Sequence, residues 1–289
     1  MTAHGTRVRP GRTVETAVLA LDGAVRVYKQ DRVAVEEPLE LRLSDGTNVR
    51  TLGVTMRTPG NDFELAAGFA FGESIVRARD RLTGITYCLD ANLDPSQQYN
   101  VVTIECEPGE FDRSAGRFER HFTMNSSCGV CGRAQLESLY DLGVRPLDDG
   151  LRIAETLLYA LPERMHEEQR IFASTGGLHA AALFDESGAC AIVREDIGRH
   201  NALDKVVGWG LLNGRLPFAR SLLLVSGRAS YEILQKAVTA RIPVVCSVSA
   251  PSSLAIDVAR EFNVTLVGFL RGNRANVYAG DERIAALAS

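Results

Sequence analysis

The sequence lacks any long apolar run, and this absence limits where the protein can work. None of its 289 residues belongs to a stretch that approaches the ~18 consecutive apolar residues of a membrane helix. Arg7, Arg9 and Arg12 lie near the N-terminus, but no apolar segment of signal-peptide length follows them. We therefore expect a cytoplasmic protein that does not associate with membranes, with a short disordered tail over residues 1–13.

The sequence also lacks an excess of positive charge. Its formal net charge is −4, so it has no general basic field with which to hold a polyanion such as duplex DNA. We expect no nucleic-acid partner, and any phosphate contact must be local. Hydrophobic residues make up 45% of the chain, which is enough to fill at least one substantial globular core.

Cysteine is scarce, and only one pair is closely spaced. This pair is Cys128 and Cys131, within a total of six cysteines. The other four lie in apolar, strand-like runs, at Cys88, Cys106, Cys190 and Cys246. In a reducing cytosol such a set is not a disulfide framework. We expect the four scattered cysteines to be small buried hydrophobic residues.

The two halves of the chain have different patterns. The first half predicts short strands at residues 25–35, 39–43, 49–56, 85–89 and 100–105. One helix is predicted over residues 63–71, after the Pro59-Gly60 break, with Asn61 or Asp62 as its cap. This pattern is typical of α+β structure and predicts a smaller N-terminal domain over residues 14–123.

The second half predicts an α/β domain over residues 124–289. A hairpin at residues 178–184 and 190–194 precedes a helix near Leu203, and an alternating βαβαβ pattern follows. Its strands are predicted at residues 221–226, 242–248 and 264–269, and its helices at residues 229–240 and 252–262. Nearly continuous apolar strands indicate a parallel sheet that is covered on both faces.

The Cys128-Gly-Val-Cys131 motif precedes a predicted helix at residues 133–140. Free backbone N–H groups and the positive dipole end at a helix start stabilise a thiolate, to which Arg133 adds. A thiolate is the form of cysteine that attacks sulfur. Zinc needs four ligands, and no second such pair or finger-like histidine spacing is present. The spacing alone remains compatible with a redox pair, sulfur transfer or metal binding.

Three segments follow the predicted parallel strands and are candidates for phosphate or nucleotide binding. Ligands of parallel α/β sheets bind outside the carboxyl ends of the strands. Two of these segments, residues 226–230 and 249–253, open helices and offer hydroxyls, N–H groups and Arg228. The third consists of Phe269, Leu270, Arg271, Gly272, Asn273 and Arg274. Ordinary helix capping by Ser is the alternative interpretation of the two helix starts.

A third group of polar residues, Arg194 to Asn201 followed by Asp204 and Lys205, lies at a strand end that leads into a helix. His200 is the group there that can move a proton near neutral pH, and His179 on the preceding strand is placed to face it. A structural ion-pair network is at least as good an interpretation for most of these side chains. The His-x-Glu pattern at His166 follows the cysteines instead of preceding them, as it would in a zinc deaminase. We interpret it as a surface feature.

Taken together and in order, these segments resemble the formate dehydrogenase accessory sulfurtransferase family, FdhD. The resemblance is carried by Ser126-Ser-Cys-Gly-Val-Cys-Gly132 and by residues 36–39, 56–60, 175–181, 194–201, 226–230, 248–254, 267–272 and 276–278. These segments span nearly the whole chain except the tail.

The resemblance implies a sulfur carrier that serves formate dehydrogenase. Such a protein accepts sulfur from a cysteine desulfurase as a persulfide on Cys128, with Cys131 as the second motif cysteine. It delivers the sulfur to the molybdenum cofactor, bis-molybdopterin guanine dinucleotide, before the cofactor enters apo-formate dehydrogenase. Residues 269–274 would hold that cofactor. The resemblance further implies a cytidine deaminase-like fold, a homodimer and no permanently bound metal.

Two other functions remain open beside the sulfur carrier. The first is a thiol-disulfide redox protein or assembly chaperone that binds formate dehydrogenase without transferring sulfur. The second is a zinc-dependent deaminase, which would contain stoichiometric zinc.

Overall fold

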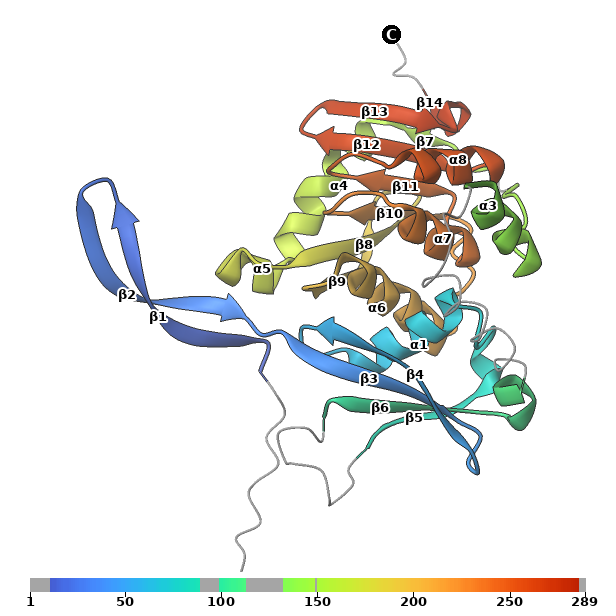
Figure 1. Ribbon diagram of the computed structural model, residues 1–289. Helices are drawn as coiled ribbons and strands as arrows, with labels where there is room; N and C mark the ends of the chain where they lie inside the picture. Colours follow the sequence, from blue (N-terminus) through green and yellow to red (C-terminus); the bar gives the residue numbers. More distant parts are fainter. Residues whose placement is uncertain (1–10, 89–98, 113–131, 149, 286–289) are drawn as a thin grey trace, which may run out of the picture.

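The computed structural model describes residues 11–88, 99–112, 132–148 and 150–285. They form two main sheets, with a hairpin that projects from one side (Figure 1). None of the helices in these ranges is long and apolar enough to cross a membrane. The cysteine motif lies outside the described residues, as do positions 89–98.

The projecting hairpin consists of β1 (Thr13–Asp22) and β2 (Val25–Ala34) (Figure 1). The two strands pair in continuous antiparallel register. Our sequence analysis predicted β2 but missed β1, because residues 17–21 form an unbroken apolar run without the alternation of a strand. Leu21, Val27 and Tyr28 are exposed on the hairpin. Strand β1 begins at residue 13, where the predicted tail ends.

The first main sheet has four strands in the order β4-β3-β6-β5. Its members are β3 (Glu37–Ser44), β4 (Val49–Arg57), β5 (Leu82–Tyr87) and β6 (Val101–Cys106). The predicted turn between β3 and β4 is confirmed, since Asp45 Oδ1 accepts hydrogen bonds from the backbone N–H groups of Thr47 and Asn48. The short helix η1 (Arg79–Arg81) leads into β5.

Helix α1 (Asp62–Gly72) covers this sheet and was predicted within one residue at each end. Its predicted side-chain cap is wrong. Asn61 occupies the cap position with a left-handed backbone, φ 59°, and its side chain makes no capping bond. The amide oxygen of Asn61 instead accepts a hydrogen bond from Arg12.

The second main sheet has six strands in the order β13-β12-β11-β10-β8-β9. It contains β8 (His179–Asp185), β9 (Cys190–Asp196), β10 (Ser221–Val225), β11 (Val244–Ser247), β12 (Thr265–Arg271) and β13 (Arg274–Ala279). Strands β10, β11 and β12 are parallel, and β8 is antiparallel to β10. The predicted βαβαβ unit and hairpin are confirmed, whereas β13 was not predicted.

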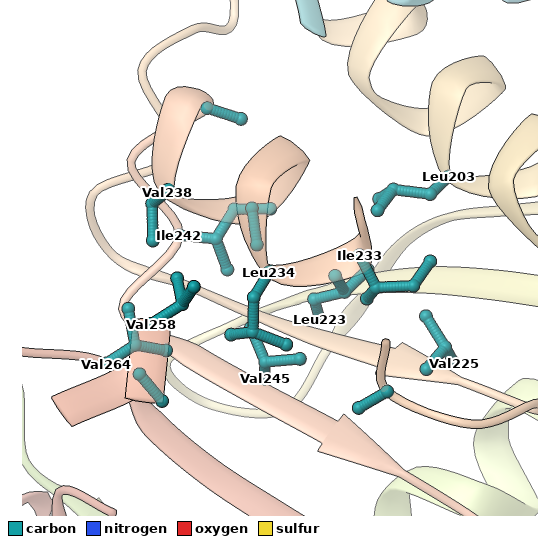
Figure 2. Close-up of a cluster of buried hydrophobic side chains, with 14 of the residues drawn as sticks. Leu203, Leu223, Val225, Ile233, Leu234, Val238, Ile242, Val245, Val258 and Val264 are labelled. Carbon is teal, nitrogen blue, oxygen red and sulfur yellow. The ribbon is translucent and has the colours of Figure 1, made fainter. Parts of the chain in front are cut away.

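Both faces of the six-stranded sheet are covered, as the apolar strands indicate (Figure 1). One face packs against α6 (Arg199–Leu212), α7 (Tyr231–Thr239) and α8 (Ser253–Glu261). Figure 2 shows part of that cluster, in which Leu223 and Val225 of β10 meet Ile233 and Leu234 of α7. The other face packs against α4 (Glu155–Glu168).

The remaining elements lie around this sheet. They are α3 (Gly132–Asp141), β7 (Ile153–Ala154), α5 (Arg170–Thr175), η2 (Asp281–Arg283) and β14 (Ile284–Ala285). Helix α3 begins directly after the cysteine motif, in agreement with the predicted helix at residues 133–140.

Helices α1 and α6 join the two main sheets (Figure 1). They cross with their backbones in contact, and glycine is required at the crossing. A Cβ atom on Gly68 would lie 1.8 Å from the carbonyl oxygen of Asp204, and one on Gly208 would lie 1.8 Å from that of Glu64. This crossing fixes how the N-terminal sheet sits relative to α6 and its neighbours.

Candidate functional site

Most of the sequence motifs meet at one edge of the six-stranded sheet. Strands β10, β11 and β12 are parallel and end there, and because β8 runs the other way, its first residue His179 lies at the same edge. Strand β9 also ends there, at Asp196. We call this the carboxyl edge. It is where ligands of α/β sheets usually bind.

Hydrogen bonds join the loops of the carboxyl edge to one another. The hydroxyl of Ser226 accepts from the backbone N–H of Ala180, and the hydroxyl of Ser247 donates to the carbonyl of Gly227. Ala229 and Pro251 form an isolated bridge between the loops that follow β10 and β11. The two loops are therefore held together as one surface.

The start of helix α8 confirms the capping interpretation, whereas that of α7 does not. The hydroxyl of Ser252 accepts from the backbone N–H of Ala255 and so caps α8. Ser230 occupies the cap position of α7, but its side chain makes no capping bond. Its hydroxyl lies 3.2 Å from Nε2 of His200 instead. The Ser230 side chain at the start of α7 therefore contacts His200 and does not act as a helix cap.

His200 lies between a carboxylate and a hydroxyl. Its Nδ1 is 2.8 Å from Oε2 of Glu232, and its Nε2 faces Ser230. The hydrogen bond from His200 lowers the pKa of Glu232. Glu232 therefore stays ionised near neutral pH and orients the imidazole, so that Nε2 can exchange a proton with a neighbouring group. Sequence analysis named His200 but missed Glu232, which belongs to no motif we had singled out.

His179 lies deeper in the same edge. Burial, together with the charges of Arg199 and His200, lowers its pKa, so the ring is neutral near neutral pH. A Cβ on Gly227 would lie 3.4 Å from Nδ1 of His179. The loop after β10 therefore passes close to the histidine. The predicted pairing of the two histidines stays a prediction, because the contacts of His200 among the described residues are with Glu232 and Ser230.

Two arginines at the carboxyl edge have unused hydrogen-bonding capacity. Arg228 is exposed and has no hydrogen bond or ion pair within the part of the chain that the structure describes. Nε of Arg199 is buried and lacks a hydrogen-bond partner among the same residues. A guanidinium presents donors in a fork that matches phosphate oxygens. Both side chains are available to an anion.

Most of the polar side chains between Arg194 and Lys205 form structural ion pairs and hydrogen bonds. This was the alternative interpretation of the segment. Arg194 forms two bonds to Glu64 of α1, of 2.5 and 2.7 Å. Nζ of Lys205 is 2.6 Å from Oδ2 of Asp196, and both side chains are buried. Asn201 donates to the carbonyl of Met56 in β4. These contacts join β9 to α1, α6 to β9, and α6 to the N-terminal sheet. Arg199 and His200 are the members that remain at the edge.

The segment predicted as a nucleotide-binding loop is mostly strand. Strand β12 continues to Arg271, pairs with Arg274 of β13, and leaves only Gly272 and Asn273 as a tight turn. The prediction of a loop was wrong because sequence analysis missed β13. Phe269 has a left-handed backbone, φ 53°, and its side chain is 43% exposed. Nε of Arg271 donates to the carbonyl of Val248, which places it against the loop after β11.

Cysteine burial matches the sequence-based expectation at two of the four scattered positions. Cys106 and Cys246 are buried, and burial raises their pKa values to about 11 and about 12. Cys88 is only half-buried, and Cys190 is exposed at the first position of β9, just after the hairpin turn. Cys128 and Cys131 lie outside the described residues. His166 is exposed on α4, so its interpretation as a surface feature is confirmed.

A polar cavity of about 420 Å³ lies beside the carboxyl edge, between both halves of the molecule. Its walls come from β4, α1, α3, α6 and α7. Gln135 lines it from α3, the helix that directly follows the cysteine motif, and its carbonyl accepts from the hydroxyl of Tyr231. His200 and Glu232 belong to the same lining. The cavity was not predicted, because five separate elements build it and no local pattern marks them.

A buried ion pair forms part of this cavity, and it predicts a pH-dependent stability. Oδ1 of Asp204 is 2.7 Å from Nζ of Lys236. Burial raises the pKa of Asp204 from 3.8 to about 6, although Lys236 pulls it down. Because the folded state holds this proton more tightly than the unfolded state, stability from this group is present below pH 3.8 and is lost as the pH rises towards about 6.

Replacing Lys236 with Met should therefore destabilise the protein more at high pH than at low pH. Without Lys236 the pKa of Asp204 rises further, so an unpaired buried carboxylate costs about 3–5 kcal/mol when ionised, at about pH 8, and much less when protonated, at about pH 5. Urea unfolding followed by the fluorescence of Trp209 measures this. Lys29→Met, at an exposed lysine of β2, is the matched control. An equal loss at both pH values would contradict the assignment.

Comparisons with known proteins agree over most of the chain. The sequence profile of the FdhD/NarQ family matches residues 34–285. A protein of Streptomyces avermitilis named sulfur carrier protein FdhD is 51% identical over 270 residues, covering 93% of this chain and 94% of its own. Its namesake from Sulfurisphaera tokodaii is 41% identical, covering 92% of this chain and 97% of its own.

A solved structure has the same fold. It comes from Desulfotalea psychrophila, is described as a formate dehydrogenase accessory protein, and superposes with a TM-score of 0.73. It covers 95% of this chain and 100% of its own, at 24% sequence identity. At this identity, the likeness shows that the two proteins share a fold.

Proposed function

The chain belongs to the FdhD/NarQ family, and from that premise we propose that it is a sulfur carrier that serves as an accessory protein of formate dehydrogenase. The observation that carries the proposal is the 51% identity with a protein named as a sulfur carrier, along 93% of the chain. We propose further that it acts as a sulfurtransferase. It accepts sulfur from a cysteine desulfurase as a persulfide on Cys128, with Cys131 assisting.

The proposed acceptor is the molybdenum cofactor, bis-molybdopterin guanine dinucleotide, which is cargo that then enters apo-formate dehydrogenase. The guanine nucleotide is assigned to residues 269–274, where Phe269 offers an exposed ring face and Arg271 a cation. Arg228 and the buried Nε of Arg199 support a phosphate site nearby. Strands β12 and β10 are two spacings apart, roughly 10 Å, a span that a nucleotide diphosphate can bridge.

Loading with a cysteine desulfurase tests the proposal directly. The purified protein is incubated with a desulfurase and free cysteine, and the Cys128 peptide is then analysed by mass spectrometry. One additional sulfur atom on that peptide is the expected result. A protein that instead only cycles between a dithiol and a Cys128–Cys131 disulfide would lose two hydrogen atoms and gain no sulfur, which would favour the redox or assembly chaperone.

Phe269→Ala and Arg271→Ala should each weaken binding of GDP without affecting persulfide loading. Loss of a stacked base costs about 1–3 kcal/mol, so we expect roughly tenfold or weaker affinity for Phe269→Ala by isothermal titration calorimetry. Val277→Ala, at another exposed apolar residue of the β12–β13 hairpin, and Arg215→Ala, at an exposed loop residue, are the controls. Unchanged GDP affinity in both test variants would remove the guanine site from this stretch.

We also propose that the protein is a cytoplasmic homodimer. The projecting β1–β2 hairpin supports self-association, because an isolated two-stranded ribbon is only marginally stable in water. Its exposed apolar side chains include Leu21 and Tyr28. It also carries three acidic and three basic residues, the balance that a self-complementary two-fold interface requires. Light scattering in solution measures the assembly state.

The domain division at residue 123 and the deaminase-like topology are likewise proposals. The proposed N-terminal domain, residues 14–123, contains all of the four-stranded sheet, and the proposed α/β domain, residues 124–289, contains all of the six-stranded sheet. A mixed sheet with helices on both faces supports the deaminase-like assignment of the second domain.

A further inference from the structure

One buried side chain that lines the cavity beside the carboxyl edge has no partner for its amide among the described residues. Gln235 of α7 is only 7% exposed and lines the cavity. Its side-chain amide makes no hydrogen bond within the part of the chain that the structure describes. Asn201, at 8% exposure in the same lining, is by contrast fully engaged with Met56, Asp196 and Thr55.

With no partner among the described residues, this amide can pair with a group that enters the cavity. A carboxamide offers one carbonyl oxygen as acceptor and one NH₂ group as donor. A group that completes both would present a donor and an acceptor side by side, which is the pattern of a cyclic amide. Gln235 therefore points to a ligand with an amide-like edge.

The charges of the cavity indicate which part of a ligand it takes. Asp204, Glu73 and Glu232 face Lys236 and His200 across the lining. Lys236 is already held by Asp204 at 2.7 Å and by Glu73 at 3.9 Å. The carboxylates of the cavity would repel an anionic group such as phosphate. Arg199 and Arg228 would attract the same group to the carboxyl edge. The cavity instead suits a neutral group with N–H donors.

The cavity has one phenylalanine ring in its lining. Phe69 of α1 lines it, with Nζ of Lys236 5.8 Å from the ring centroid. At the mouth, Oε2 of Glu232 interacts with His200, and its second oxygen accepts no hydrogen bond from a described residue. A carboxylate accepts paired N–H donors well. The volume of about 420 Å³ is within the roughly 300–1,000 Å³ of small-molecule sites.

We propose that this cavity binds a planar heterocycle with a cyclic amide and an amino group, the feature that pterin and guanine share. Gln235 pairs with the amide edge, Glu232 accepts from the amino edge, and Phe69 covers the ring face. The inference rests on the proposed function, because the proposed acceptor carries both heterocycles. With guanine assigned to residues 269–274, the occupant of the cavity is the pterin.

Binding of neopterin, followed by its own fluorescence, tests this proposal with the full-length protein. We expect saturable binding that weakens roughly tenfold or more in Gln235→Leu, which removes the amide at nearly constant volume. Glu232→Gln, at a side chain that is 57% exposed and so does not endanger folding, should also weaken binding. Gln30→Leu, at an exposed glutamine of β2, is the matched control.

A second titration with guanosine distinguishes the two heterocycles. Gln235-dependent binding of either one supports the cavity as a heterocycle site, and neopterin is the ligand we expect to bind more tightly. Neopterin affinity that is absent, or is unchanged in both Gln235→Leu and Glu232→Gln, overturns the inference. Persulfide loading is measured on the same preparations. A failure to load sulfur would count against the proposed sulfur carrier and would leave the binding result for the cavity unaffected.

Discussion

Replacing Cys128 with Ser should abolish the sulfur-bearing form of the protein completely. A persulfide requires a sulfur–sulfur bond, and a serine hydroxyl cannot form one or attack sulfane sulfur at neutral pH. After incubation with a cysteine desulfurase and cysteine, intact-protein mass spectrometry should therefore find no added sulfur. Formate dehydrogenase matured in cells that contain only this variant should lose activity to the background level.

The remaining cysteines provide the controls for this experiment. Cys190→Ser removes the exposed cysteine of β9 and should load sulfur like the unmodified protein. Cys131→Ser tests whether loading and release of sulfur depend on different cysteines of the motif. Normal loading with slower release would identify Cys131 as the cysteine that releases sulfur. Undiminished loading of Cys128→Ser would contradict the assignment of the carrier cysteine, and loss of loading in Cys190→Ser would transfer the role to β9.

The architecture of the second half could be predicted well from sequence because each element has a strong local pattern. Strands β10 and β11 are nearly continuous apolar runs, and α7 and α8 begin after Ser residues with helical spacing behind them. The prediction was wrong where local pattern is weak. Strand β13 has exposed and half-buried residues only, and it exists because β12 offers it an edge to pair with.

The candidate site could be predicted only in part, for a related reason. Motifs at strand ends converge because parallel strands end on one side, so His200 and Arg228 could be named in advance. Glu232 and Gln235 could not, because their roles depend on how α7 packs against α1, α3 and α6. The sequence offered one signal for these two residues. They are three positions apart, so they share a face of the helix that follows the Ser226–Ser230 loop. The division between structural and functional charges in residues 194–205 likewise depends on contacts with Glu64 and Met56, over 100 residues away.

Replacing Gly208 with Ala should be among the most destabilising single substitutions in the protein. The new methyl group would lie 1.8 Å from the carbonyl oxygen of Glu64, and this carbonyl, in the first turn of α1, cannot move away without displacing the start of the helix. We expect a loss of more than about 3 kcal/mol in the free energy of unfolding, above the usual cost of overpacking. Denaturant unfolding followed by the fluorescence of the adjacent Trp209 measures it.

The same substitution should reduce ligand binding before the protein unfolds, because α1 and α6 both line the cavity. Phe69 comes from α1 and Glu73 from its C-terminal cap, whereas His200, Asn201 and Asp204 come from α6. Separating the helices by even part of the clash enlarges the space between Phe69 and Asn201, so neopterin should bind more weakly to folded Gly208→Ala. Gly53→Ala in β4, where a Cβ meets nothing within 4 Å, should change neither quantity. If Gly208→Ala and Gly53→Ala have the same free energy of unfolding, the expected clash of 1.8 Å at the α1–α6 crossing is contradicted.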